Sequence, residues 1–334
     1  MKRFKEFLSK YGQGILILTV TLLILKLGLG YVSYEMFNLK RDVRDIYRII
    51  SGKADKRDEM PRLPFSVKFC DRTIYFSENQ DLRERVEREF YNYLGQPNLL
   101  IFYAKLEAKY FPIIEKKLRE NDLPDDLKFV TIVETKLDHT AVSGKGATGI
   151  WQLIAATAKR LGLKINQWVD ERLDPIRSTE NVIKLFKELY GRFNDWFLVL
   201  AAYNWNPKGV EDSIKKQGER DYFKLIFNKE TDRYGPQAIA IKIIFSNLED
   251  YGICLEKEDG YKFSEFEEIT VLVKNWLTVK EIARASDSYF REIKLLNPWI
   301  KNDRLPKGKY KIRLPDGKKE VFVANFKGKI IKEN

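Results

Sequence analysis

One glutamate and a set of glycines are the residues whose types and spacing point to chemistry. The stretch VETKLDHTAVSGKGATGIWQ, residues 133–152, places Glu134 at the end of an apolar segment and Gly144, Gly146 and Gly149 in a G-x-G-x-x-G spacing. A partly buried carboxyl group has a raised pKa and suits general acid catalysis. The glycine spacing is that of a dinucleotide-binding loop. The two features therefore predict different proteins.

The dinucleotide hypothesis requires a buried strand directly before the first glycine, so that a helix N-terminus meets the pyrophosphate. The run FVTIV ends at Val133, and residues 134–143, which are polar and loop-like, separate it from Gly144. The spacing therefore gives nucleotide binding little support. Spacing alone also favours a solvated helix-end residue at Glu134 over a catalytic one.

The composition excludes other kinds of catalytic site. His139 is the only histidine among 334 residues, and the two cysteines, Cys70 and Cys254, show no C-x-x-C pattern. A zinc site or a histidine-based triad therefore lacks its residues. The cysteines fit either two small buried side chains or one disulfide, depending on the compartment.

The net charge of +12 is concentrated at one end of the chain. Residues 301–334 hold eleven lysines and arginines against four acidic residues. The remaining chain is too weakly basic to favour a nucleic-acid groove. The tail fits either a solvated segment or contact with an acidic polymer such as the cell wall.

Residues 14–34 predict a transmembrane anchor, because 21 largely apolar residues with Lys26 as the only charge span roughly 31 Å as a helix. A cleaved signal peptide is the alternative, but no A-x-A-like site follows. Residues 1–13 would then be a cytoplasmic tail. Basic residues flank both sides of the span, so charge does not set its orientation.

Residues 35–64 predict a stalk helix followed by a polar linker from Ser51. Two heptads are compatible with weak self-association of this helix. The apolar residues at heptad-like spacing are Met36, Leu39, Val43, Ile46 and Ile50.

The remaining chain predicts a mainly α-helical domain at 65–255, a linker at 256–266 and a small α+β module at 267–334. Apolar periodicity predicts helices after Pro124 and over 150–161, a helix with Ser178 as its N-cap, and two buried helices, DWFLVLAAYN and YGPQAIAIKIIFSNLEDYG. The residue pattern of the module predicts a strand, two helices, a loop and a second strand, in that order.

Four blocks between roughly Cys70 and Gly252 carry a resemblance to a known family. They are VETKLDHTAVSGKGATGIWQL, DERLDPIRST, DWFLVLAAYNWNPKGV and KETDRYGPQAIA. In this order and at these distances they resemble the catalytic domain of soluble-type lytic transglycosylases, which is similar in fold to goose-type lysozyme. The resemblance is closest to the membrane-bound lytic murein transglycosylases of the D type, and the C-terminal module resembles their LysM-like extension.

The resemblance implies Glu134 as the catalytic acid. It implies substrate-binding roles for Thr135, Gly146, Gly149, Trp151, Gln152, Tyr203, Asn204 and Tyr234. Tyr234 belongs to an E-T-x-x-Y-x-P element that begins at Glu230. Trp205 and Asn206 depart from the family, which has small residues after A-Y-N, so the rim of the groove is expected to differ.

The implied reaction needs one carboxyl group and no metal or cofactor. Glu134 would protonate the glycosidic oxygen between N-acetylmuramic acid and N-acetylglucosamine, then take the proton of the muramic C6 hydroxyl, which closes on C1. The alternatives are a hydrolytic muramidase with Asp138 or another acidic residue as base, and a non-catalytic, membrane-tethered peptidoglycan-binding protein. The expected partner is the peptidoglycan glycan strand rather than nucleic acid. The domain would then lie on the periplasmic side of a bacterial cytoplasmic membrane.

Overall fold

The computed structural model describes residues 61–331. The predicted tail, anchor and heptad segment, together with most of the linker up to residue 64, lie outside these residues. Within the described range, no helix combines the length and the apolar character needed to cross a membrane.

The described chain begins with a short hairpin that the sequence did not predict. Strands β1 (Ser66–Phe69) and β2 (Arg72–Tyr75) pair antiparallel, and Cys70 makes the turn at φ 53°. Arg72 ties the hairpin to the helical domain by two bonds of 3.0 and 2.9 Å to the Asp221 carboxylate. Cys70 and Cys254 are both free thiols.

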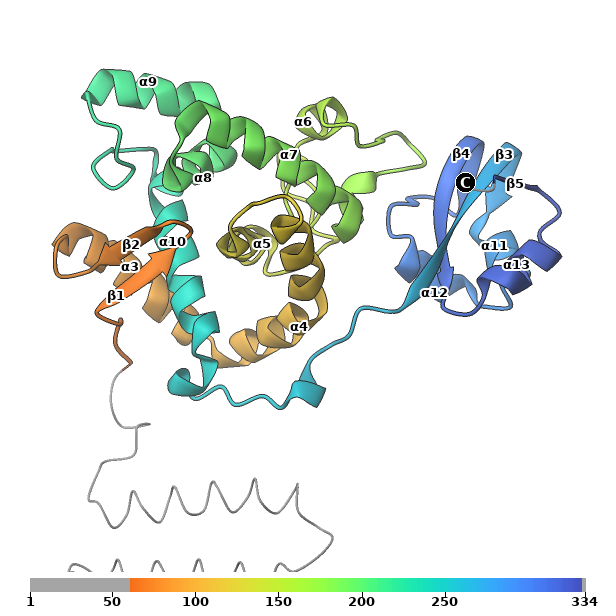
Figure 1. Cartoon of the computed structure of the whole chain (residues 1–334), viewed down its shortest axis with the longest axis horizontal. Coiled ribbons are helices and arrows are strands. Elements are labelled where there is room, and N and C mark those ends of the chain that lie inside the picture. Colours follow the sequence, from red (N-terminus) through yellow and green to blue (C-terminus); the bar gives the residue numbers. More distant parts are fainter. Residues whose placement is uncertain (1–60, 332–334) are drawn as a thin grey trace, which may run out of the picture. The chain divides into compact units, whose positions relative to one another are not determined.

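Helices make up the rest of the first domain, which confirms the predicted class. They are α3 (Gln80–Leu94), α4 (Pro97–Arg119), α5 (Val130–Thr135), α6 (Ala155–Arg160), α7 (Pro175–Phe193), α8 (Trp196–Asn204), α9 (Pro207–Gln217) and α10 (Lys229–Ser246). Figure 1 shows α5 in the middle of this domain, with α4, α7, α8 and α10 around it. The domain is therefore built around the helix that carries Glu134 in its last turn.

Helices α8 and α10 lie inside the domain because of their apolar composition. Seven of the nine residues of α8 are buried, from Trp196 to Ala202, and α10 is buried over most of its length. A helix that is apolar on all sides gains stability only inside a core, where each fully buried large side chain contributes about 1.5–3 kcal/mol. These are the two buried helices expected from the sequence, although α10 begins five residues before the predicted segment.

Two predicted helix boundaries are wrong. The helix expected over 150–161 is only α6, because Thr148 and Leu153 pair as a bridge and hold the preceding residues in a tight loop. Helix α7 begins at Pro175, and Asp174 rather than Ser178 is its N-cap, accepting from the backbone N–H groups of Ile176 and Arg177. Proline in the first turn after an aspartate is a stronger start signal than an incomplete capping box.

The C-terminal module has the predicted strand, helix, helix, strand order and adds two elements. Its elements are β3 (Phe266–Thr278), α11 (Val279–Ala285), α12 (Phe290–Leu296), β4 (Arg304–Pro315), α13 (Lys319–Asn325) and β5 (Lys329–Ile331). The sheet order is β4-β3-β5, all antiparallel. A capping box between Thr278 and Glu281 turns the chain from β3 into α11.

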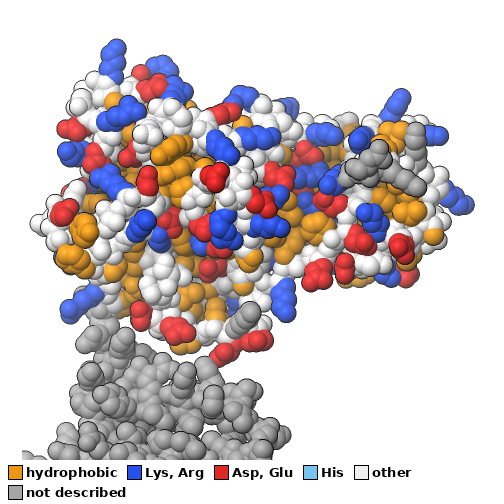
Figure 2. All heavy atoms as spheres, viewed as in Figure 1, with side chains coloured by type: hydrophobic (Ala, Val, Ile, Leu, Met, Phe, Trp, Pro, Cys, Tyr) orange, Lys and Arg blue, Asp and Glu red, His pale blue; other side chains and the backbone are white. Residues whose placement is uncertain are grey.

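Charge is dispersed over the surface. Figure 2 shows acidic and basic side chains interspersed around hydrophobic ones on the visible face of the described chain. Exposed charges of the described chain also form ion pairs, for example Arg192 with Glu211 and Lys208 with Asp212. The positive net charge is therefore not gathered into one stripe on this face.

The loop before α6 depends on one glycine, which gives a test of the fold. Gly149 has φ +83°, and a Cβ atom there would lie 1.9 Å from the carbonyl oxygen of Arg172. We expect Gly149→Ala to lower the free energy of unfolding by roughly 2–4 kcal/mol, measured by urea denaturation. Gly144→Ala is the matched control, because nothing lies within 4 Å of its Cβ position. Equal stabilities of the two variants would contradict this account.

Candidate active site

Glu134 lies at the C-terminal end of α5, where the helix stops abruptly. Lys136 and Leu137 both adopt left-handed backbone angles, at φ 54° and 67°, and turn the chain away after one and a half turns. The Tyr234 hydroxyl on α10 donates to Glu134 Oε1 at 2.5 Å. The sequence thus folds so that a helix end presents one carboxyl group, and a residue 100 positions later fixes its orientation.

The surroundings of Glu134 change its proton affinity. Burial raises the pKa of Glu134 to about 7, which is the largest effect. The Tyr234 hydrogen bond opposes this rise because it favours the ionised form, while the negative charge of Glu230 supports it. A pKa near 7 lets one group give and retake a proton at neutral pH.

Two tyrosines form the wall beside this carboxyl group, Tyr234, which is buried, and Tyr203, which is partly buried. Burial raises the pKa of Tyr203 and of Tyr234 well above their ordinary value, so both remain neutral donors. The Tyr203 hydroxyl donates to the carbonyl oxygen of Trp151 at 2.5 Å, and its ring packs on Phe186. This bond joins α8 to the glycine loop and positions both beside Glu134.

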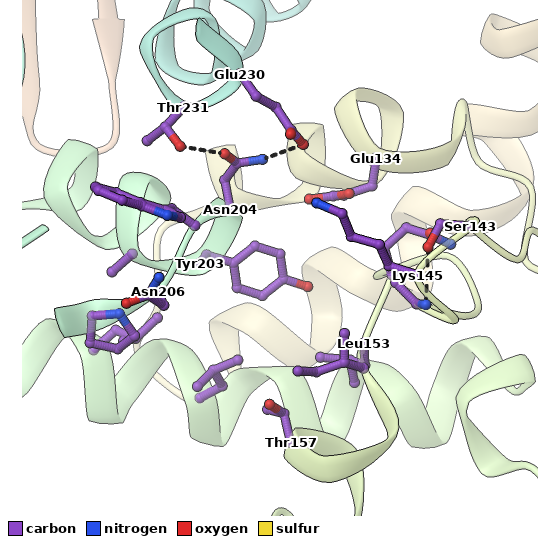
Figure 3. A pocket seen from close by; sticks show the side chains of 18 of the residues that line it. Glu134, Ser143, Lys145, Leu153, Thr157, Tyr203, Asn204, Asn206, Glu230 and Thr231 are labelled. Atoms are coloured by element: carbon purple, nitrogen blue, oxygen red, sulfur yellow. Dashed lines mark hydrogen bonds between the residues drawn. The ribbon is translucent and has the colours of Figure 1, made fainter. Parts of the chain in front are cut away.

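Asn204 holds a second polar group in the cleft. Its Oδ1 accepts from the Thr231 hydroxyl at 2.8 Å, and its Nδ2 donates to Glu230 Oε1 at 3.3 Å. Figure 3 shows this chain of contacts on one side of the cleft, with Tyr203 and Glu134 next to it. Helices α8 and α10 therefore place an amide and a carboxylate opposite the glycine loop.

The glycine loop, residues 143–153, is a compact turn that carries Gln152 into the cleft. Gln152 adopts φ 46°, and its Nε2 donates to the carbonyl oxygens of Ala141 and Gly149 at 3.2 and 3.0 Å. Its amide nitrogen is thereby committed to the loop, and its Oε1 is the atom left to accept a hydrogen bond from a ligand. The element before this loop is a helix rather than a strand, which contradicts the dinucleotide hypothesis.

These elements enclose a cleft of about 830 Å³. Its rim includes Trp205, which is 42% exposed, followed by Asn206 and Pro207. Asn206 accepts from the Gly209 N–H at 2.8 Å and caps α9, with Pro207 in the first turn. The departure from the family pattern is therefore a helix start that places a tryptophan at the rim.

The predicted site residues fall into two groups. Glu134, Gln152, Tyr203 and Asn204 line the cleft, and Gly146 lies in the loop between two lining residues. Four others lie behind this surface: Thr135, Gly149, Trp151 and Tyr234.

Trp151 does not take the contact role expected of it. The side chain is fully buried, and its Nε1 donates to the Thr179 hydroxyl at 2.8 Å. It packs edge-on against Phe186 in the core. Trp151 therefore supports the cleft wall through its backbone carbonyl group, and its ring does not reach the cleft.

Sequence reasoning missed three charged residues that line the cleft, Lys145, Arg160 and Glu230. Because of Glu230 the cleft holds a second carboxylate besides Glu134. The signal for Glu230 was its place in the E-T-x-x-Y-x-P element. Asp138, the expected base of the hydrolytic alternative, is exposed, and its carboxylate accepts from Thr140 N at 2.8 Å instead.

Family comparison agrees with this geometry. Residues 111–226 match the model of the transglycosylase SLT domain. The chain contains an SLT domain. Residues 267–327 match the LysM-like domain of lytic transglycosylase MltD.

Two relatives resemble the chain over part of its length. Membrane-bound lytic murein transglycosylase D of Escherichia coli (strain K12) is 32% identical over 187 residues, which are 54% of this chain and 40% of that protein. A putative tributyltin chloride resistance protein of Alteromonas sp. (strain M-1) is 34% identical over 96 residues, which are 28% of this chain and 46% of that protein. The chain thus matches less than half the length of these relatives.

A solved structure is also similar in part. The 70 kDa soluble lytic transglycosylase SLT70 of Escherichia coli aligns with 69% of this chain and 37% of its own, at a TM-score of 0.38 and 15% identity.

The raised pKa of Glu134 has a consequence for stability. A carboxyl group that holds its proton more tightly in the folded chain destabilises the fold as pH rises from its ordinary value near 4.5 toward 7. We expect Glu134→Gln to gain stability over the wild type across this range, by up to about 3 kcal/mol at pH 8. Urea denaturation between pH 4 and 8 measures the difference.

The control for this prediction is Glu78→Gln, because Glu78 is exposed in a loop. This variant makes the same chemical change outside the cleft, so the pH dependence of its stability is the reference for that of Glu134→Gln. A difference between Glu134→Gln and wild type that stays constant with pH would contradict the assignment.

Proposed function

We propose that the chain is a peptidoglycan lytic transglycosylase. It cleaves the β-1,4 bond between N-acetylmuramic acid and N-acetylglucosamine and forms a 1,6-anhydro end on the muramic acid. The observation that carries this proposal is a carboxyl group with a pKa of about 7, bound to Tyr234 in the cleft of an SLT domain. The name of the transglycosylase D relative supports the same reaction.

In the first step, protonated Glu134 donates its proton to the glycosidic oxygen. The bond from that oxygen to C1 of muramic acid breaks, and positive charge develops at C1 and the ring oxygen. Burial raises the pKa of Tyr203 and of Tyr234, so both hold their protons and neither competes with Glu134 as the acid. The Tyr234 hydrogen bond then stabilises the carboxylate that has formed.

In the second step, the Glu134 carboxylate takes the proton of the C6 hydroxyl group, whose oxygen bonds to C1. The attacking oxygen belongs to the substrate, so no second carboxylate is needed as a nucleophile. Asn204 and Gln152 line the cleft, and in this proposal they bond the acetamido groups of the sugars. The exposed face of Trp205 offers a stacking surface at the rim.

Replacement of the acid tests the reaction. We expect Glu134→Gln to retain murein binding and to release less than about a thousandth of the wild-type soluble product, because the amide has no proton to donate. Mass spectrometry of released muropeptides measures the product. Asp138→Asn is the control and should remain active, since Asp138 is exposed and bonded to Thr140. Activity in the Glu134 variant would overturn the assignment.

The same spectra distinguish the hydrolytic alternative. Glu230 lines the cleft and bonds Asn204, so it is better placed than Asp138 to activate a water molecule. A hydrolase would release reducing ends, heavier by one water than the anhydro product. A wild-type chain that sediments with murein and releases nothing would instead identify a binding protein.

We also propose that residues 14–34 anchor the chain in the bacterial cytoplasmic membrane. Residues 65–255 would form the catalytic domain on the periplasmic side, and residues 267–334 a glycan-contacting module. The apolar composition of the segment and the membrane-bound transglycosylase D relative support this. We expect removal of residues 1–34 to let the chain be extracted without detergent, as cell fractionation followed by immunoblotting would show. Retention of the shortened chain in the membrane would contradict the anchor.

A further inference from the structure

The C-terminal module is docked on the SLT domain by backbone pairing. The chain from Leu63 onward forms one compact unit. Val169 of the SLT domain pairs with Ile300 of the module as an antiparallel bridge. The Asp170 N–H donates to the Trp299 carbonyl oxygen at 2.8 Å, and the Lys301 N–H donates to the Trp168 carbonyl oxygen at 2.9 Å. Val169 belongs to the hydrophobic core of the module.

A buried ion pair accompanies this pairing. Arg313 on β4 is 2% exposed, Asp174 is 0% exposed, and their Nη1 and Oδ2 atoms lie 2.9 Å apart. Arg177 lies over the Trp299 ring at 4.3 Å and donates to the Lys311 carbonyl oxygen at 2.5 Å. Arg313 Nε also lies 3.3 Å from Glu268 Oε1 of the module, and Arg177 Nε lies 3.5 Å from Asp174 Oδ2. Loss of the Arg313–Asp174 contact would leave each buried charge with only its weaker partner.

The docked segment continues directly into the floor of the cleft. The Asp170 carboxylate binds Arg172 through two bonds, of 2.9 and 2.7 Å. Arg172 Nη1 donates to the carbonyl oxygens of Gly146 and Leu153, each at 2.9 Å. These two carbonyl groups flank Gln152 in the sequence, so one guanidinium group holds the loop that presents Gln152.

We propose that the module is a positioning part of the active site. Docking through Trp299 and Arg313 fixes Asp170 and Asp174, Asp170 fixes Arg172, and Arg172 holds the glycine loop opposite Glu134. Arg313 is thus a positioning residue at a distance from the reacting atoms. This inference rests on the proposed function, since its readout is the transglycosylase reaction.

A module that serves only as a tethered glycan binder would behave differently. Its loss of contact with the SLT domain would raise KM and leave kcat unchanged, because binding would weaken and the reacting groups would stay in place. A positioning module acts on geometry in the transition state, so its release lowers kcat.

The test uses the full chain with Arg313→Met, Arg313→Lys and Arg177→Met. Hydrogen exchange at the amides of Asp170 and Lys301 reports docking, because both amides bond across the contact. Steady-state release of anhydro product from uncrosslinked peptidoglycan strands gives kcat and KM. The control is Arg284→Met, an exposed arginine of α11.

We expect Arg313→Met to lose protection at both amides and at least tenfold in kcat, with KM within threefold of wild type. Arg313→Lys should recover most of this loss, and Arg284→Met should match wild type. Arg177→Met should show the same pattern more weakly, and it serves as the test if Arg313→Met does not fold.

Two results would overturn the positioning role alone. One is an active wild type whose variants lose amide protection but keep kcat within twofold. The other is full amide protection in both Arg313→Met and Arg177→Met, which would show that these side chains do not hold the module. A wild-type chain that releases no anhydro product would overturn the proposed function as well, whatever the amide protection.

Discussion

The structure depends on placing one ionisable group at the edge of a hydrophobic core. Glu134 lies in the last turn of a helix whose other residues are all buried, and a carboxyl group in such a place resists ionisation. The Tyr234 hydrogen bond limits this resistance, so that the pKa settles near 7 rather than far above it. Helices α5 and α10 must therefore hold a fixed distance, which their shared core enforces.

The backbone on the other side of the cleft is also held in a fixed position relative to Glu134. The loop before α6 reverses the chain within a few residues, and Gly149 packs its Cα directly on the Arg172 carbonyl group. The Arg172 side chain then binds two carbonyl groups of that loop. A single residue thus contacts the loop through both its backbone and its side chain, which leaves the loop little freedom to move relative to Glu134.

Sequence patterns predicted what depends on local chemistry and on family motifs. The helical class, the buried helices α8 and α10, and the strand and helix order of the module follow from apolar periodicity and turn residues. The family resemblance grouped Glu134, Gln152, Tyr203 and Asn204, and all four line the cleft. The burial of Trp151 was not predictable, because it and Gln152 are neighbours in a turn whose left-handed angle at Gln152 sends the two side chains in opposite directions.

Contacts between residues far apart in the chain could also not be predicted from the sequence. No local pattern links Arg313 to Asp174, 139 positions earlier, or distinguishes Arg313 from the other basic residues of the C-terminal segment. Burial of that one charge contributes little net stability, because desolvation offsets much of the attraction. What the pair supplies is a preference for one orientation, since any other docking would separate Arg313 from Asp174 and leave each with only its longer ion pair. The basic C-terminal segment, whose composition suggested a solvated tail, therefore includes Arg313, the charge that sets how the module contacts the SLT domain.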